Sequence, residues 1–274
     1  MKIGVVGWGY VGATTGLGLR TFHEILVYDP FKDIEKFSID YIGELPTKNL
    51  TDNLKHVDKL EKMAEADVIF VCLPTPTVDG KIDMSYIDNF FAECSKTLKK
   101  GMFVIRSTVS PGTTRKLQKK YPQYKFANNP EFLRERTPLH DFLYPSRIVI
   151  GSDNKELIDK LLDVYKPFEC HKIVTNSDTS ELIKYAANCF LATKISYFNE
   201  IHRICEKCNI DSKVVSEAVS LDERIGRYGI YGGRPFGGTC LPKDISAFIA
   251  HVKEVGLEPT LLNAVKNVNE EMTD

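Results

Sequence analysis

The fold is decided by residues 2–12, KIGVVGWGYVG, at the start of the chain. An apolar run typical of a buried strand leads into Gly7, Gly9 and Gly12, which are spaced as G-x-G-x-x-G. Gly7 permits the tight turn, Gly9 lets the backbone approach a pyrophosphate, and Gly12 allows the following helix to pack closely on the strand. The start of that helix offers free N–H groups to phosphates. The stretch therefore predicts a Rossmann-type dinucleotide-binding domain.

A second strand-like run, ILVYDP, ends in Asp29, which lies 22 residues after Gly7. An acid at this place accepts hydrogen bonds from the ribose 2′-hydroxyl and repels a 2′-phosphate, which favours NAD over NADP. Lys32 follows closely and could reach the ribose, although it fits a solvated surface lysine almost as well. Tyr10 and Val11, between the glycines, complete the cofactor contacts expected in this region.

Residues 1–175 alternate strand and helix signals and so predict a doubly wound α/β sheet. Buried parallel strands are expected at 3–6, 25–28, 68–72, 102–105 and 147–150. Helices are expected at 84–98, 113–120 and 155–165. This part of the chain is the predicted NAD-binding domain.

Residues 176–274 carry mainly helical signals and predict a separate all-α central domain. No Gly or Pro occurs between Asp178 and Cys208, which indicates one long helix. Asp178 and Glu181 fit a D-x-x-E helix start, in which each side chain satisfies exposed backbone N–H groups. A Gly-rich loop at 226–238 interrupts the helical pattern.

The composition excludes several classes of function. The net charge of −1 at pH 7 gives no general reason to bind nucleic acid or an anionic membrane. The sequence shows neither a signal peptide nor a membrane span, so a cytoplasmic location is expected. The odd number of scattered cysteines argues against a disulfide framework. No metal is expected, because the histidines form no ligand pattern and the CxxC of Cys205 and Cys208 lacks a second pair.

Cys240 lies in a setting that favours a reactive thiolate. Pro242 is well placed as the first residue of a helix, Lys243–Val255, so the cysteine comes just before a helix N-terminus and close to Lys243. Both features lower a thiol pKa. The glycines that precede it leave room for a substrate. The alternative is a small buried cysteine, the commonest situation for this residue type.

Further segments do not follow from a generic dinucleotide-binding domain. They are LPTP at 73–76, RSTVSPGTT at 106–114, NPEFLRE at 129–135, KYAAN at 184–188 and FGGTCLPKD at 236–244. Together, in this order and along the whole chain, they closely resemble the UDP-glucose/GDP-mannose dehydrogenase family. The resemblance implies NAD-dependent oxidation of the primary alcohol of a UDP-hexose, UDP-glucose above all, to a carboxylate through a cysteine thioester.

The resemblance also assigns roles to individual residues. It makes Cys240 the nucleophile, with Asp244 beside it. Lys184 and Asn188, four residues apart, share one helix face and by spacing alone would suit a solvated surface. The resemblance instead places them at the catalytic centre, where they would hold a substrate hydroxyl and a developing oxyanion. Glu131 would handle protons or water.

The resemblance implies further contacts at the cofactor and at a neighbouring subunit. Glu135 would lie near the nicotinamide, and Thr75 and Thr108 would line the cofactor and the active site. Arg224 would reach the substrate of the neighbouring subunit, although a solvated arginine is the alternative. The stretch LATKISYFNEI at 191–201 is richer in apolar residues than one core face requires, and predicts a homodimer through the long helix.

The candidate residues fall into three groups. Those for catalysis are Cys240, Lys184, Asn188, Asp244, Glu131 and Thr108. Those for cofactor binding are Gly7, Gly9, Tyr10, Val11, Gly12, Asp29, Lys32, Thr75, Thr108, Glu135 and Lys243. Those for binding the nucleotide-sugar substrate are Glu131, Phe132, Leu133, Lys184, Asn188, Arg224 and Gly237.

Other functions stay open from the sequence. GDP-mannose dehydrogenase, or another nucleotide-sugar dehydrogenase, would use identical chemistry. A hydroxyacid dehydrogenase also joins a Rossmann domain to helices, but needs no nucleophilic cysteine. A weakly active or non-catalytic relative is a further alternative, although every catalytic position is filled. Two departures from the family stand: the linker after Asp29 lacks a common Glu-Pro-Gly element, and the third α/β domain, which binds much of the nucleotide, has no counterpart before Asp274.

Overall fold

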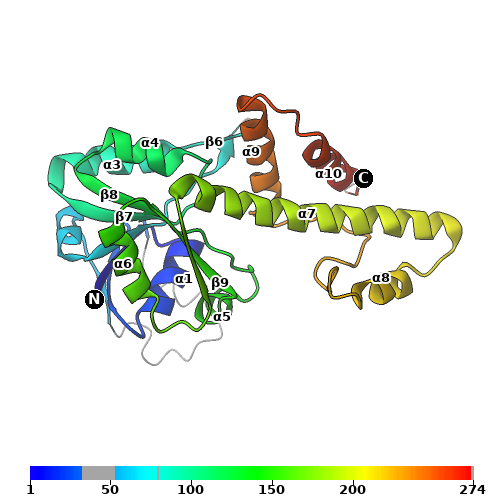
Figure 1. The fold of residues 1–274 in the computed structure, drawn as a ribbon, viewed down its shortest axis with the longest axis horizontal. Coiled ribbons are helices and arrows are strands. Elements are labelled where there is room, and N and C mark those ends of the chain that lie inside the picture. Colours follow the sequence, from blue (N-terminus) through cyan, green and yellow to red (C-terminus); the bar gives the residue numbers. More distant parts are fainter. Residues whose placement is uncertain (33–52, 79, 273–274) are drawn as a thin grey trace. The chain divides into compact units, whose positions relative to one another are not determined.

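The computed structural model describes residues 1–32, 53–78 and 80–272 (Figure 1). The chain divides into two compact units. The first comprises residues 1–75 and 83–184, and the second comprises residues 76–82 and 185–274. The long helix α7, Ser177–Cys208, supplies residues to both. The domain boundary expected at residue 175 stays a prediction.

The first unit is built on an eight-stranded sheet in the order β10-β9-β8-β7-β4-β1-β2-β3. Its strands are β1 Lys2–Val6, β2 Glu24–Tyr28, β3 Leu54–His56, β4 Val68–Val71, β7 Gly101–Ile105, β8 Tyr124–Asn128, β9 Arg147–Gly151 and β10 His171–Thr175. All neighbouring strands are parallel except β8 and β9. The predicted α/β class with a doubly wound, mainly parallel sheet is confirmed.

Helices cover both faces of this sheet (Figure 1). One face packs against α1 Tyr10–Leu19, α5 Pro138–Leu143 and α6 Lys155–Val164. The other packs against the 3₁₀ helix η1 Leu60–Glu65, α3 Ser85–Thr97 and α4 Thr113–Lys120. Alternation along each strand separates the two cores: Val5 of β1 belongs to the first and Val6 to the second.

The glycines after β1 have the conformations that the fingerprint requires. Gly7 has a φ of 87°, in the left-handed region that favours glycine. A Cβ on Gly12 would lie 1.8 Å from the carbonyl oxygen of Gly7, so only glycine fits there. The turn therefore lies at the carboxyl end of β1, the edge at which open α/β sheets bind their ligands.

The second unit is mainly helical. It contains most of α7 together with α8 Ser212–Ser220, α9 Leu241–Glu254 and α10 Thr260–Glu271. Its core includes Cys189 and Ala192 of α7, Ile245 of α9 and Val265 of α10. A short hairpin, β5 Thr77–Val78 with β6 Lys81–Ile82, packs against α9.

Most of the expected elements form within two residues of their predicted bounds, but two local expectations were wrong. The D-x-x-E motif does not cap α7, because Asn176 Oδ1 accepts the Thr179 N–H at 2.8 Å and takes that role. Asp178 pairs instead with Arg115 at 3.0 Å. Pro242 is not the first residue of its helix, since α9 already begins at Leu241.

The strands β3, β8 and β10 and the hairpin β5–β6 were not foreseen from the sequence. All seven cysteines are free thiols. Within the described ranges, no helix combines the length and the apolar character that crossing a membrane would require.

Candidate active site

The first group of candidate residues surrounds the glycine turn in the first unit. A Cβ on Gly9 would meet no atom within 4 Å, so the backbone is open to a ligand at this point. The first turn of α1 contains no acidic residue, and its N-cap Gly9 provides no side-chain cap. The N–H groups at the start of α1 are thus available to a diphosphate, which the helix dipole also favours. The turn fits a dinucleotide cofactor.

Asp29 is fixed beside this turn at the end of β2. Its Oδ2 accepts the Trp8 N–H at 2.7 Å, and its Oδ1 accepts the Phe31 N–H at 2.9 Å. Each carboxylate oxygen keeps a second lone pair that can accept a ribose hydroxyl. Lys32 follows Phe31 in the same loop. Two backbone bonds therefore hold the acid in place for the contact that the sequence predicted.

The loops after β4 and β7 meet at the same edge of the sheet. The Thr75 hydroxyl donates to the Thr108 carbonyl oxygen at 2.8 Å, so the structure brings these two predicted site residues together. The Ser107 hydroxyl donates to the carbonyl oxygen of Leu73 at 2.6 Å, which gives the loops a second link. Their roles at the cofactor stay predictions.

Glu131 and Lys184 form a buried ion pair. Lys184 Nζ lies 2.6 Å from Glu131 Oε1 and donates to the Glu131 carbonyl oxygen at 2.8 Å. Their side chains are 6% and 5% exposed. Glu131 Oε2 also accepts the Leu133 N–H at 2.7 Å. Burial raises the pKa of Glu131, but the charge and hydrogen bond of Lys184, together with the Leu133 N–H and the Arg106 charge, outweigh burial, so the net pKa lies below its usual value.

Phe132 lies between this pair and a second cation. The Lys184 ammonium is 5.7 Å from the centre of the Phe132 ring, and the Arg147 guanidinium is 3.8 Å from it. Both distances allow cation–π attraction. The Tyr10 hydroxyl donates to the Arg134 carbonyl oxygen at 2.8 Å, which ties α1 to the same segment. Glu135, also in this segment, is exposed.

The segment that carries Glu131 is supported by a buried network that sequence reasoning missed. Asn129 Oδ1 accepts hydrogen bonds from Arg106 and from the Tyr165 hydroxyl, and its Nδ2 donates to the Val149 carbonyl oxygen at 2.7 Å. Arg106 is 6% exposed. Arg106 and Asn129 both lie inside the conspicuous motifs, but nothing in their spacing showed that they would meet.

The second group surrounds Cys240 in the second unit. Cys240 is the N-cap residue of α9, as its expected place before a helix required. Asp244, one turn further on, is 1% exposed. Its Oδ2 accepts the Asn188 side-chain N–H at 2.6 Å, and its Oδ1 is 2.5 Å from Lys243 Nζ. Lys243, which was expected to act on the Cys240 thiol, thus also forms an ion pair with the Asp244 carboxylate.

A second cysteine belongs to the same unit. Cys189 is buried, and burial raises the pKa of its thiol to about 12, with the Asp244 charge adding to the rise. A thiol with this pKa stays protonated at neutral pH, and the thiolate is the nucleophilic form. Cys189 is therefore no competitor for Cys240 as a nucleophile.

The loop before Cys240 is held by amide side chains that the sequence did not reveal. Asn199 of α7 accepts the Gly233 N–H at 3.0 Å and donates to the Arg234 carbonyl oxygen at 2.9 Å. Asn269 of α10 does the same at Phe236, where the two bonds measure 2.6 and 3.1 Å. Because these bonds go to backbone, no sequence motif marks them.

Two predicted substrate residues in this loop are open to their surroundings. Arg224 has an 89% exposed side chain and pairs with Asp222 at 2.5 Å. A Cβ on Gly237 would meet nothing within 4 Å. Both observations suit contacts with a further molecule, but the contacts themselves stay predictions.

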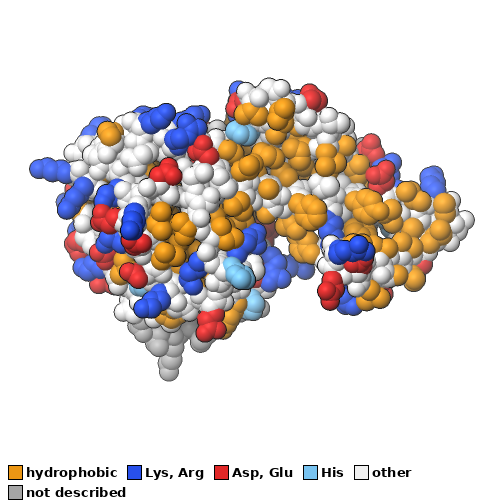
Figure 2. Space-filling model, in the orientation of Figure 1, with side chains coloured by type: hydrophobic (Ala, Val, Ile, Leu, Met, Phe, Trp, Pro, Cys, Tyr) orange, Lys and Arg blue, Asp and Glu red, His pale blue; other side chains and the backbone are white. Residues whose placement is uncertain are grey.

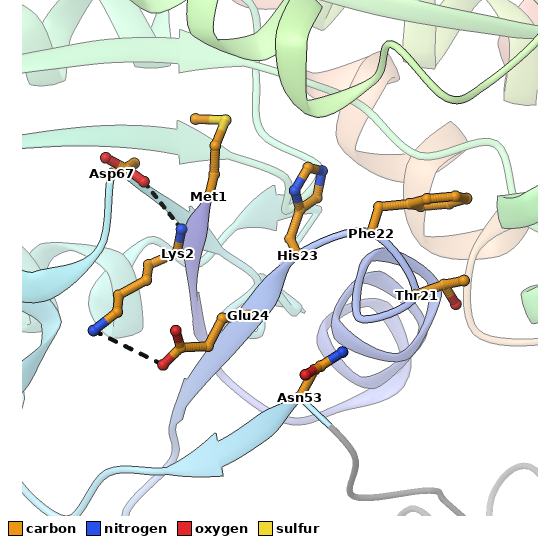
Figure 3. A pocket seen from close by; sticks show the side chains of 8 residues that line it. All are labelled: Met1, Lys2, Thr21, Phe22, His23, Glu24, Asn53 and Asp67. Atoms are coloured by element: carbon orange, nitrogen blue, oxygen red, sulfur yellow. Dashed lines mark hydrogen bonds and ion pairs between the residues drawn. The ribbon is translucent and has the colours of Figure 1, made fainter.

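A surface pocket of about 480 Å³ lies elsewhere, where β1 and β2 begin (Figure 3). It is lined by Met1, Lys2, Thr21, Phe22, His23, Glu24, Asn53 and Asp67. None of the candidate site residues is among them. Ligands of open α/β sheets bind at the carboxyl ends of the strands, so we assign the cofactor to the glycine turn and not to this pocket.

Comparison with known proteins agrees with this geometry. Residues 1–169 match the NAD binding domain of the UDP-glucose/GDP-mannose dehydrogenase family, and residues 178–271 match its central domain. A UDP-glucose 6-dehydrogenase of Rickettsia bellii is 35% identical over 292 residues, covering 99% of this chain and 67% of the relative. The chain belongs to the UDP-glucose/GDP-mannose dehydrogenase family. Its members are NAD-dependent nucleotide-sugar dehydrogenases, and NAD is the cofactor of this chain.

Solved structures show the same relationship. A UDP-glucose dehydrogenase from Pyrobaculum islandicum superposes with a TM-score of 0.91 at 34% identity, covering 98% of this chain and 68% of that one. A UDP-D-ManNAc dehydrogenase from Pyrococcus horikoshii superposes with a TM-score of 0.87 at 21% identity, covering 99% and 69%. At the latter identity the likeness concerns the fold alone.

Replacing Asp29 should weaken the discrimination between the two dinucleotides. In Asp29→Ala, the acceptor for the ribose hydroxyl and the repulsion of a 2′-phosphate are both lost, so the ratio of NAD to NADP affinity should fall roughly tenfold. Titration calorimetry with each dinucleotide measures this ratio. Asp153→Ala, which removes an exposed acid from the same unit, is the control. An unchanged ratio would contradict the assignment of Asp29.

Removing one partner of the buried ion pair should cost more stability than removing both. Lys184→Met leaves a buried carboxylate unpaired and should lower the free energy of unfolding at pH 7 by about 3–5 kcal/mol. The double variant Lys184→Met with Glu131→Gln should regain part of that loss. Urea denaturation measures both, and Lys166→Met, at an exposed lysine, is the control.

The same variants should respond differently to acid. The folded-state pKa of Glu131 is lowered, so its stabilising contribution is present above the unfolded value of 4.5 and is lost as pH falls through the folded pKa. In Lys184→Met the carboxyl becomes protonated more readily, and the deficit relative to wild type should shrink as the pH approaches 4.5. A deficit that stays constant with pH would argue against an ionised pair.

Proposed function

We propose that this chain oxidises C6 of UDP-glucose from the alcohol to the carboxylate, with two NAD consumed per turnover and a thioester on Cys240 as the intermediate. The observation that carries the proposal is the arrangement in the second unit, where Cys240 lies at the N-cap position of α9 and the buried Asp244 is bonded to Asn188. A hydroxyacid dehydrogenase has no use for a cysteine in this position.

The helix terminus supports Cys240 as the nucleophile. The N-terminal end of α9 carries partial positive charge, which stabilises a thiolate over a thiol. A Cβ on Gly237, three residues before Cys240, would meet no atom within 4 Å, so the chain leaves space at this point of the loop. Cys189, in contrast, is kept protonated by burial.

The proposed reaction has two oxidative stages. NAD bound at the glycine turn would supply the hydride acceptor for each stage. In the first, the C6 hydroxyl loses its proton to a base and C6 loses a hydride, which gives an aldehyde. The Cys240 thiolate then attacks the aldehyde carbon, forming a C–S bond and an oxyanion. Loss of a second hydride from C6 converts this thiohemiacetal into a thioester.

Hydrolysis completes the reaction. Water attacks the thioester carbonyl, the C–S bond breaks, and the thiolate is regenerated together with the carboxylate. The overall change is one alcohol, two NAD⁺ and one water to one carboxylate, two NADH and three protons. The covalent bond is needed because a carbonyl carbon must become a hydride donor for a second time, and it also retains the intermediate.

The buried polar side chains suit the remaining roles. Lys184 Nζ donates two hydrogen bonds to Glu131, and in our proposal its third N–H stabilises the oxyanion together with the Asn188 amide. Glu131, whose pKa is held low, is a carboxylate that can accept a proton or orient water. Asp244 is the alternative residue for directing water.

UDP-glucose is proposed as the substrate because several relatives that match along the chain are named as UDP-glucose 6-dehydrogenases. The test is NADH formation with a panel of nucleotide sugars that includes UDP-glucose, GDP-mannose and UDP-N-acetylmannosamine. The highest kcat/KM should be found with UDP-glucose. A preference for either of the others would keep the chemistry and change the substrate.

The thioester route predicts two NADH for each sugar acid formed. Cys240→Ser should abolish or severely slow acid formation and leave NAD binding within a few-fold of wild type, because the cysteine lies outside the dinucleotide turn. NADH absorbance and chromatographic measurement of the acid give the ratio, with Cys208→Ser, at an exposed cysteine, as the control. One NADH per product, with free aldehyde accumulating in the wild type, would refute the route.

We also propose that the chain forms a homodimer through α7. Phe190, Tyr197 and Ile204 recur at seven-residue intervals along this helix and are 65%, 56% and 52% exposed. Val214 and Leu221, 61% and 71% exposed, lie on and just after α8. Figure 2 shows hydrophobic side chains gathered over this part of the second unit. A seven-residue repeat on one helix suits packing against the same helix of a second copy.

The dimer is tested by sedimentation. Wild type at micromolar concentration should sediment at twice the chain mass of 31.0 kDa, because the exposed stripe is buried between two copies. Tyr197→Glu should shift it toward the monomer. Tyr86→Glu, at an aromatic residue of the first unit that is 50% exposed, should not. A wild-type monomer under these conditions would count against the interface.

A further inference from the structure

Glu181 belongs to α7 but caps a different helix. Its Oε2 accepts the Gly112 N–H at 2.6 Å, and its Oε1 accepts the Thr114 N–H at 2.8 Å. These two amides lie at the N-terminal end of α4, whose N-cap is Gly112 with a φ of 91°. Because glycine has no side chain to cap the helix, the carboxylate reaches it from 69 residues further along the chain. Glu181 itself is 1% exposed.

The two bonds connect the elements that carry two of the candidate catalytic residues. The loop that leads into α4 contains Thr108, whose carbonyl oxygen accepts the Thr75 hydroxyl. On α7, Glu181 lies three residues before Lys184, which is paired with Glu131. One buried carboxylate therefore fixes the loop of Thr108 to the helix of Lys184, and all of these contacts lie within the first unit.

We propose that Glu181 is a positioning residue for the dehydrogenase reaction, which holds the Thr108 loop at a fixed spacing from the Lys184–Glu131 pair. The catalytic consequence of this inference rests on the proposed function, whereas the contacts of Glu181 are independent of it. Hydride transfer is sensitive to small displacements of the groups that orient the reactants. A loosened Thr108 loop thus lowers the rate of the chemical step in a protein that still folds and still binds its cofactor.

The alternative is a helix cap that only stabilises α4. A cap of this kind is normally supplied by a Ser, Thr, Asp or Asn at the N-cap position, where the side chain remains partly hydrated. Here the group is a buried carboxylate, whose desolvation is costly. The neighbouring hydroxyl of Thr113 bonds to the Ser110 carbonyl oxygen at 2.6 Å and leaves the cap to Glu181. A helix cap that requires the desolvation of a carboxylate is explained if the same carboxylate also fixes α4 to α7.

Burial gives Glu181 a signature that can be measured without any substrate. It raises the pKa of this carboxyl to about 7, against the opposing effect of Thr114 and the two amides. The Asp178 carboxylate on the same helix adds to this rise in the pKa of Glu181. The Arg115 side chain of α4 is paired with Asp178 at 3.0 Å. Since the folded pKa exceeds the unfolded value of 4.5, this contribution to stability is present below pH 4.5 and is lost as pH rises to about 7.

The catalytic test compares Glu181→Gln with Asp153→Asn. Gln keeps the shape of the side chain but its NH₂ group cannot accept a hydrogen bond, so one of the two links is lost. Per folded molecule, kcat with UDP-glucose should fall roughly tenfold, the equivalent of one charge-assisted hydrogen bond, while the NAD dissociation constant stays within about threefold. Asp153→Asn, at an exposed acid of the same unit, should leave both unchanged.

The substrate-free test uses the same variants. Glu181→Gln cannot ionise, so its unfolding free energy should lack the fall that wild type shows from this group between pH 4.5 and 7, and Asp153→Asn should keep it. Should Glu181→Gln fail to fold, Glu181→Asp keeps the charge with a shorter reach, and the same separation of kcat from NAD affinity is expected. If wild type oxidises no nucleotide sugar, the proposed function fails, while the pH dependence still reports whether Glu181 is buried as described.

Two results would overturn the inference. In the first, Glu181→Gln has the same kcat per folded molecule as wild type and differs only in a lower melting temperature. Glu181 would then be a structural cap. The other is a parallel loss of kcat and NAD affinity, which would indicate general damage to the first unit and no specific positioning.

Discussion

The Lys184 ammonium and the Glu131 carboxylate, buried side by side, are the constraint on which the first unit depends. Neither charge could stay in that place alone, because an isolated buried ion loses far more hydration than its surroundings return. The start of α7 must therefore remain docked on the segment after β8. That segment is in turn held by Asn129, which gathers Arg106, Tyr165 and the backbone of β9. A charge pair with a catalytic candidate at each end is thus also a structural requirement.

Helix α7 makes similar polar contacts with other segments along its length. Its polar side chains are used to hold backbone or catalytic groups of other segments: Glu181 holds the start of α4, Asn188 holds Asp244, and Asn199 holds the loop before Cys240. Buried backbone N–H and C=O groups need partners, and irregular loops cannot provide enough of them internally. A long regular helix supplies the partners at fixed spacings. This explains why residues of α7 bond to so many of the segments that carry the candidate site.

Much of the fold could be predicted from the sequence because its signals are local. The helix at Thr113–Lys120 formed with the predicted bounds, and β1 and β2 formed where apolar runs indicated them. Several of the elements that were missed have weaker signals. The strand β10, HKIVT, is only partly buried at the edge of the sheet, and β5 and β6 are two residues each. Such short or exposed strands exist because a neighbour is available to pair with them, which no local pattern records.

The candidate site likewise contains residues that the sequence indicated and residues that it did not. The family motifs indicated Lys184, Asn188, Cys240 and Asp244 as candidate site residues. The residues that hold them in place could not be recognised from the sequence. Glu181 was assigned to the start of its own helix because its spacing from Asp178 fits a capping pattern, whereas in the structure it caps α4. Lys243 was expected to act on the thiol, and it pairs with Asp244. For Glu181 the residue type was read correctly and its partner was not, while the effect of Lys243 on the thiol stays a prediction.

The sequence by itself determined the glycine turn, the position of Asp29 at the end of β2 and the order of the motifs. These features act on the backbone within a few residues, and steric limits on φ, together with hydrophobic periodicity, allow few alternatives. Only the tertiary structure decided which buried polar group would meet which. Glu131 and Lys184 are 53 residues apart, and Gly112 and Glu181 are 69 apart. The free energy that selects such partners comes from removing both from water at once, and this happens only when the packed core forms.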